Sequence, residues 1–324
     1  MIFNLFFRWI LFVTFALAGS ALWAQSYPDK PVRFIVPTTQ GGGADTLARH
    51  IATRLSERWG QQVVVENRPG ANGISGVESV AKAAPDGYTL LMTFTDHFVN
   101  PSLYKTLPFN MSKDFAPVVF VGSLPFVLAV NPAVQANSVQ ELVALARSKP
   151  GQLTFGSAGT GGSVHLAGEL FRSMANVDIT HVPYKGTGAA MPDLIGGRID
   201  MMFPSAITAK AFADTGRLRL LAVTGAQRSP DVPQLPTVAE AGIPGFEVGI
   251  WYGVLVPAAT PSDIVRKLNA QIRDIVGAED FKAMMAKQGV TVAPGTPEQF
   301  SAFYTAEMKK WAKVVTDAKI QPLN

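Results

Sequence analysis

Two glycine-rich loops carry the clearest chemical potential in this sequence. Residues 37–43 and 156–162 each follow a short apolar run and precede apolar residues at helical spacing. Backbone N–H groups at the start of a helix have no internal acceptors and carry partial positive charge. Glycine leaves these groups accessible because it has no Cβ. Each loop is therefore suited to bind a carboxylate or a phosphate without an arginine or a lysine.

The loops and nearby strand ends supply the candidate ligand-binding residues. The charge of Asp45 would oppose an adjacent anion, so it is also interpreted as a helix cap, and the amides of residues 41–43 are the stronger candidates. His165 has an alternative interpretation as a cap or packing residue. We expect contacts from Thr38, Thr39, Gly41, Gly42, Gly43 and Asp45, from Ser157, Ala158, Gly159, Thr160 and His165, and from Thr93, Thr95 and Ser205.

The sequence argues against catalysis, metal binding and cofactors. Neither loop ends in the Gly-Lys-Ser/Thr of a P-loop or matches G-x-G-x-x-G cleanly. Ser157 and Ser163 each lack one flanking glycine of a nucleophile elbow. The four histidines show no metal-site spacing, and the absence of cysteine excludes disulfides and thiolate zinc sites. We expect no catalytic residue, no metal and no cofactor.

Residues 1–24 have the layout of a secretory signal peptide. Arg8 precedes an apolar run over residues 9–18, and small residues lead to a cleavage position near Ala24. An uncleaved membrane anchor is the alternative. Export would place the chain in the periplasm, and residues 25–324 are enough for two domains. The net charge of +4, without a basic run interleaved with aromatics, does not suggest nucleic-acid binding.

Short β-branched runs alternate with helical patterns, which predicts an α/β fold with largely parallel sheets. We expect a helix over 44–59 and a segment crossing between domains over 228–236. Ser138, Thr260 and Thr296 are expected to cap later helices. The predicted strands are 32–36, 63–66, 88–92, 126–130, 153–155, 180–182, 199–203 and 218–223.

Several short motifs in a fixed order are more specific than any one loop. They are YPDKPVR at 27–33, GGGAD at 41–45, VENRPGA at 65–71, APDGYTL at 84–90, SAGTG at 157–161, HVPYKG at 181–186, PTVAEAG at 236–242 and PAATP at 257–261. Read together, they resemble the substrate-binding receptors of tripartite tricarboxylate transporters, also called the Bordetella uptake gene (Bug) family. The resemblance spans essentially all of residues 25–324.

The resemblance implies a type II periplasmic binding fold with a ligand cleft between two domains. Domain 1 would comprise residues 25–124 and 231–324, and domain 2 residues 125–230. It also implies a small carboxylate ligand, and it adds Tyr184, Lys185 and Gly186 to the candidate site. The first loop departs from the family pattern, because Pro37 is followed by Thr38, Thr39 and Gln40 rather than by phenylalanine and a small residue.

The sequence thus favours a monomeric periplasmic receptor that delivers a carboxylate to membrane permease subunits. The ligand could be an aliphatic or aromatic di- or tricarboxylate or an acidic amino acid. One alternative is a sensor receptor that reports ligand to a signalling kinase, with the same fold and site. The other is a periplasmic hydrolase, which would need a positioned nucleophile, base and acid.

Overall fold

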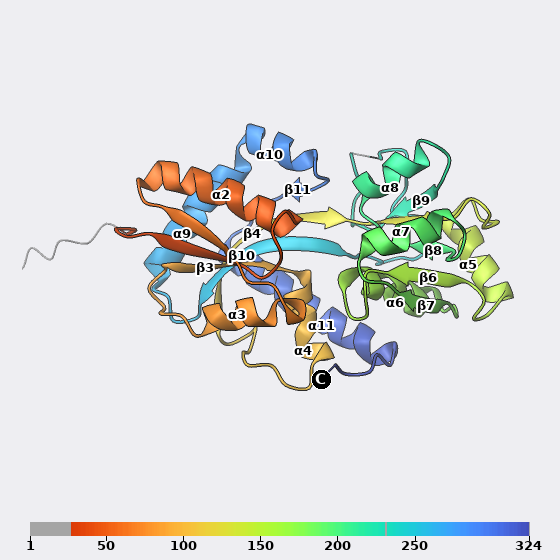
Figure 1. Ribbon diagram of the computed structural model, residues 1–324, viewed down its shortest axis with the longest axis horizontal. Coiled ribbons are helices and arrows are strands. Elements are labelled where there is room, and N and C mark those ends of the chain that lie inside the picture. Colours follow the sequence, from red (N-terminus) through yellow and green to blue (C-terminus); the bar gives the residue numbers. More distant parts are fainter. Residues whose placement is uncertain (1–26, 231, 324) are drawn as a thin grey trace, which may run out of the picture.

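Two separate β-sheets organise the chain in a computed structural model that describes residues 27–230 and 232–323 (Figure 1). The predicted signal peptide and its cleavage position lie outside these residues. We call the part built on the six-stranded sheet domain 1 and the part built on the five-stranded sheet domain 2. Figure 1 shows the two side by side, joined by the long strands β4 and β10.

The sheet of domain 1 has the order β11-β4-β10-β3-β1-β2. Strands β1, β2 and β3 are parallel, whereas β10 is antiparallel to both β3 and β4. The prediction of largely parallel sheets therefore holds for only part of this sheet. Its strands are β1 (Val32–Val36), β2 (Val63–Asn67), β3 (Thr89–Phe94), β4 (Phe115–Pro125), β10 (Gly249–Pro257) and β11 (Thr291–Val292).

The sheet of domain 2 repeats the same plan in the order β7-β6-β8-β5-β9. Strands β6, β7 and β8 are parallel, and β5 is antiparallel to β8 and β9. Consequently β6 occupies the position that β1 holds in domain 1, and β5 corresponds to β10. Its strands are β5 (Val127–Val130), β6 (Thr154–Ser157), β7 (Thr180–Pro183), β8 (Met201–Met202) and β9 (Arg219–Val223).

Helices cover both faces of each sheet because their apolar stripes require burial. In domain 1 they are α2 (Gly43–Trp59), the short 3-10 helix η2 (Ala71–Gly73), α3 (Ile74–Ala81), α4 (Thr95–Leu103), α9 (Ser262–Gly277), α10 (Glu279–Ala286) and α11 (Pro297–Asp317). In domain 2 they are α5 (Val139–Ser148), α6 (Ser163–Ala175), α7 (Thr187–Ile195) and α8 (Ala206–Ala213).

The helix caps agree in part with the sequence. The Ser138 hydroxyl accepts from the Glu141 amide, and Thr296 forms a reciprocal capping box with Gln299. Thr260 does not cap α9, which was predicted, because its hydroxyl donates to the Pro257 carbonyl at 2.7 Å and the helix begins after Pro261.

Two chain crossings join the domains, and one buried threonine links them. The first runs from β4 through Phe126 into β5, and the second enters domain 1 at Gly249. The Thr224 hydroxyl donates to the Val248 carbonyl (2.6 Å) and accepts from the Phe126 amide (2.8 Å). On the domain 1 side, the Thr95 hydroxyl bonds the Gly249 carbonyl (3.1 Å) and the Trp251 amide (2.9 Å).

The return to domain 1 therefore lies at β10, not within residues 228–236 as expected. Thr237 forms a bridge with Val223, and Val238, Ile243 and Phe246 are buried in the core of domain 2. The apolar side chains up to Val248 belong to the same core. Figure 1 shows α4 and α11 beneath the crossing strands, and Trp311 of α11 is buried in the domain 2 cluster.

Candidate ligand-binding site

The two glycine loops occupy equivalent positions in the two domains. The first follows β1 and opens α2, and the second follows β6 and opens α6. Gly41 and Gly161 have φ angles of +83° and +84°, a region that favours glycine. Gly42 and Gly162 are the N-caps, and both have a φ of −76°. The shared conformation confirms that the sequence contains a matched pair of loops.

Each loop is fixed by the same local hydrogen bond. The Gly41 amide donates to the Asp45 carboxylate at 2.9 Å, and the Gly161 amide donates to His165 Nδ1 at 3.0 Å. In both loops the acceptor lies in the first turn of the helix that follows. These two amides are therefore already bonded, which removes Gly41 from the strongest amide candidates. Gly42 and Gly162 have no side chain that could cap these helices, so the first amides of each helix lack intrahelical acceptors. The Ser163 amide bonds Asp96 instead.

Asp45 supports the first loop from a buried position. Besides the Gly41 amide, its carboxylate accepts from Arg49 (3.0 Å) and from the Asn67 side chain (2.8 Å). Burial acts to raise the pKa of Asp45, but the hydrogen bonds from Arg49, Gly41 and Asn67 outweigh it and lower the pKa. Asp45 thus remains ionised and holds the loop, in agreement with the capping interpretation.

Ser157 supports the second loop and is fully buried. Its oxygen accepts from the Gly159 amide (3.1 Å), and its hydroxyl lies within hydrogen-bond distance of both His181 Nε2 (2.7 Å) and the Gly159 carbonyl (3.0 Å). Burial and then the neighbouring His165 lower the pKa of His181 to about 4, which keeps the imidazole neutral.

His165 continues this support into α6. Because Nδ1 accepts from the Gly161 amide, the proton lies on Nε2, which is 3.4 Å from the Glu169 carboxylate. Glu169 is also paired with Arg172 at 2.7 Å. The rings of His165 and His181 lie 3.9 Å apart, centroid to centroid. These contacts assign both histidines to the inner support of the loop.

A pocket of about 490 Å³ lies between the domains where several helices begin. Gly43 opens α2, Val164 belongs to the first turn of α6, Thr187 opens α7, and Ser205 caps α8. Helix starts are favourable positions for anions because unpaired N–H groups and helix dipoles point there. Lys287 is the one basic side chain among the lining residues. The remaining lining residues are Leu124, Phe126, Pro204, Ile207, Thr208, Ile250, Tyr252 and Gln288.

Asp96, in the first turn of α4, contacts Ser163 at the start of α6. The amide and hydroxyl of Ser163, the first residue of α6, favour its charged form. Burial has the larger effect and raises the pKa of Asp96 to about 6. Its charge also acts on Tyr252, whose pKa is raised mainly by burial. The Tyr252 hydroxyl in turn lies against Gly43, because a Cβ placed there would be 2.6 Å from it.

Of the predicted residues, the structure places Gly43 and Ser205 in the lining of the interdomain pocket, and several of the other side chains already have internal partners. Besides Asp45, Ser157 and His165, this applies to two threonines and a tyrosine. Thr93 bonds His97 Nδ1 (3.0 Å), Thr95 holds β10, and Tyr184 donates to Asp193 (2.9 Å). Other predicted residues keep at least partial exposure: Thr38, Thr39, Gly42, Gly43, Ala158, Gly159, Thr160, Lys185, Gly186 and Ser205.

Sequence reasoning missed Thr187, Lys287 and Asp96. A glycine before Thr187 was the one available signal for a helix start, whereas nothing local places Lys287 or Asp96 at the other domain.

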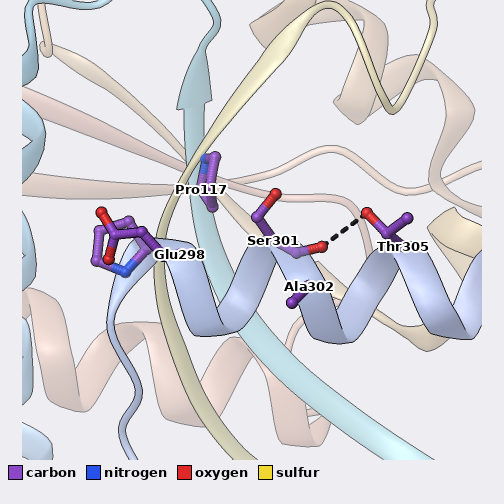
Figure 2. Close-up of a pocket in the computed structure, with 6 residues that line it drawn as sticks. Pro117, Glu298, Ser301, Ala302 and Thr305 are labelled. Atoms are coloured by element: carbon purple, nitrogen blue, oxygen red, sulfur yellow. Dashed lines mark hydrogen bonds between the residues drawn. The ribbon is translucent and has the colours of Figure 1, made fainter.

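A different pocket, of about 560 Å³, lies on domain 1 between Pro117 and the first turns of α11 (Figure 2). The hydrogen bond drawn there joins Thr305 to the Ser301 carbonyl within the helix. All its lining residues belong to domain 1, so it is separate from the paired loops.

Over residues 27–230 and 232–323, no group of three or more His, Cys, Asp or Glu side chains could hold a metal ion. Within the same part of the chain, no helix is long and apolar enough to cross a membrane.

Two sheets of equal plan, joined by two crossings around an interdomain pocket, define a two-domain periplasmic solute-binding protein. More distant solved structures share this fold, among them a methylphosphonate-bound PhnD1 from Prochlorococcus marinus with a TM-score of 0.54 at 12% identity. The chain belongs to the tripartite tricarboxylate transporter family receptors, whose sequence profile matches residues 47–320. This family consists of solute-binding receptors.

Similar proteins with the same span support the assignment. A UPF0065 protein from the tcbD-tcbE intergenic region of Pseudomonas sp. is 39% identical over 95% of this chain and 93% of its own length. Protein BugT of Bordetella pertussis is 36% identical over 96% and 97%. These matches confirm the resemblance to the Bug family.

Solved structures of similar proteins include two with carboxylates. Rpa4515 of R. palustris with adipate has a TM-score of 0.78 and 37% identity, and the match covers 92% of this chain and all of that one. MatC from Rhodopseudomonas palustris with bound malate has a TM-score of 0.72 and 31% identity, and the match covers 89% of this chain and 100% of that one.

Proposed function

We propose that this receptor captures a small carboxylate in the interdomain pocket and delivers it to the permease subunits of a tripartite transporter in the periplasm. One observation carries the proposal: α2, α6, α7 and α8 all begin at the same pocket, and they come from both domains. Four helix starts supply amide donors that suit a carboxylate better than a neutral ligand. The adipate and malate bound to similar proteins support this ligand class.

Direct contacts are assigned to the amides that have no intrahelical acceptor, those of Gly42 and Gly43 in domain 1 and Gly162 in domain 2. The exposed hydroxyls of Thr39 and Thr160 and the backbone of residues 185–186 complete the proposed site. In this proposal Asp45, Ser157 and His165 do not contact the ligand. Their hydrogen bonds hold the two loops in the conformation that presents the amides. Contacts from both domains would favour the closed arrangement when ligand is bound.

Titration calorimetry against adipate, malate, succinate, citrate and acidic amino acids tests the capture of a carboxylate. If no carboxylate binds, the proposed function is wrong. Reconstitution with the permease subunits tests delivery, because the transport rate should depend on the receptor and on its bound ligand.

Replacing an N-cap glycine by proline tests the amide contacts. Gly42 and Gly162 have a φ of −76°, which proline can adopt, and no neighbouring atom lies closer than 3.8 Å to a Cβ at either position. Gly42→Pro and Gly162→Pro remove one N–H each, while Gly42→Ala and Gly162→Ala keep it and serve as matched controls. A hydrogen bond to a charged group contributes about 1.5–3 kcal/mol, so each proline variant should bind roughly 10- to 100-fold more weakly. Equal affinities in the proline and alanine variants would refute the amide assignment.

A further inference from the structure

Asp96 places a carboxylate of the protein itself beside the interdomain pocket, which is otherwise suited to anions. It is not one of the lining residues, but its charge acts on Tyr252, which is. It extends from α4 of domain 1 to Ser163, the first residue of α6 in domain 2. One part of this carboxylate accepts hydrogen bonds from the amide and the hydroxyl of Ser163. The other oxygen, Oδ1, is buried and has no hydrogen-bond partner. A buried acceptor without a donor is costly, so its retention requires an explanation.

No basic side chain compensates this carboxylate within the described part of the molecule. Its pKa is influenced by burial and Ser163, with no lysine, arginine or histidine contributing. The nearby Tyr252 stays a neutral phenol because its pKa is raised, and His97 in the next position is neutral because burial lowers its pKa to about 3. Lys287 lines the pocket but makes no contact with Asp96 that contributes to its ionisation.

Asp96 lies at the junction that domain opening would separate. Its own helix belongs to domain 1, whereas Ser163 belongs to domain 2 and precedes Val164, a lining residue of the pocket. A relative movement of the domains would change this contact with Ser163, and a ligand held next to Asp96 would meet the unpartnered Oδ1. A second carboxylate there would meet a like charge in a desolvated place. An ammonium group there would give Oδ1 a charged donor.

We propose that Asp96 is the specificity-determining residue of the pocket and that it binds the ammonium group of an amino acid whose carboxylate is held by the helix starts. This inference rests on the proposed carboxylate capture and narrows its ligand class. The unpaired Oδ1 receives the ammonium N–H, and the amides at α2 and α6 receive the adjacent carboxylate. The pocket lining also contains the basic residue Lys287, which is complementary to the second carboxylate of an acidic amino acid.

Two ligand pairs that differ only in the amino group test the proposal by calorimetry. L-aspartate is compared with succinate, and L-glutamate with glutarate, on wild-type protein and on Asp96→Asn. Wild type should bind the amino member of a pair at least tenfold more tightly. Asp96→Asn should reduce this ratio at least tenfold, because its side chain has no charge to pair with ammonium. Asp263→Asn, at an exposed first-turn aspartate of α9, should keep the wild-type ratio.

The ratio of the affinities for the two members of a ligand pair distinguishes ligand recognition by Asp96 from a merely structural role of this residue. A structural role would weaken both members of a pair equally and leave the ratio unchanged, which would overturn the proposal. A wild-type protein that binds succinate as tightly as aspartate would also overturn it, even if Asp96→Asn did not fold. In either case, binding of succinate, adipate or malate would leave carboxylate capture intact. Failure of the whole panel would overturn both.

Discussion

Replacing Asp96 by asparagine should stabilise the ligand-free protein at neutral pH. The ordinary pKa of an aspartate is 3.8, and burial raises that of Asp96 to about 6 in the folded state. At about 1.4 kcal/mol per pKa unit, ionisation of Asp96 costs the folded state about 3 kcal/mol. Asparagine is close in shape and carries no charge, so the variant avoids this cost.

The sign of the pH dependence follows from proton binding. Between about pH 4 and 6 the folded protein holds a proton on Asp96 that the unfolded chain has released. The contribution of this residue to the free energy of unfolding is therefore least unfavourable below pH 4 and declines as the pH rises through 6. Asp96→Asn should exceed wild type by up to about 3 kcal/mol at pH 7.5, and the difference should shrink toward pH 4.

Urea unfolding followed by circular dichroism at several pH values between 4 and 8 measures this difference. The protein must first be freed of bound ligand, because a ligand that prefers the folded state would obscure the effect. Asp263→Asn provides the control and should follow wild type. If Asp96→Asn is no more stable than wild type at pH 7.5, or if the difference does not change with pH, the assignment of a buried, uncompensated charge is wrong.

Three further substitutions have expected outcomes that equilibrium unfolding can measure. Gly43→Ala should lower the free energy of unfolding by about 1–3 kcal/mol, because its Cβ would lie 2.6 Å from the Tyr252 hydroxyl, and Tyr252→Phe should restore the loss; no restoration would contradict the clash. Asp45→Ala should cost about 3 kcal/mol at pH 7, and because the pKa of Asp45 is lowered in the folded state, the difference from wild type should diminish in acid. Glu307→Ala should cost about 2–6 kcal/mol because two buried indole N–H groups lose their acceptor, and an unchanged stability would show that this carboxylate is dispensable.

Local sequence patterns predicted the elements around the first loop closely. Residues 32–36 form β1 as expected, and the predicted helix over 44–59 differs from α2 by one residue at its start. These elements were accessible because a β-branched run, a glycine-rich turn and an apolar stripe follow one another without interruption. The equivalence of the two loops also followed from sequence, since each pairs a strand end with a helix start.

The junction between the domains could not be predicted in the same way. Strands β4 and β10 carry apolar residues on both faces, so they lack the alternation that marks a half-exposed strand. Helix α4 contains Pro101 and reads as a loop. Asp96 acquires its environment from Ser163 and Tyr252, which are distant in sequence. The polar contacts of the site are mostly of this long-range kind, and only the fold brings them together.

Thr224 and Thr95 restrict where the protein can bend, because each holds one side of the crossing at residues 248–249. Thr224 fixes Val248 and Phe126 to domain 2, and Thr95 fixes Gly249 to domain 1. Val248 and Gly249, which are adjacent in the second crossing, are thus held by different domains. Bending between the domains is therefore confined to the peptide that joins them and to Pro125–Phe126 in the first crossing. Such a short bending segment lets each domain rotate as a rigid unit. A small rotation at this point becomes a much larger displacement at the outer surfaces, where the permease subunits of the proposed function would meet different surfaces in the loaded and the empty receptor.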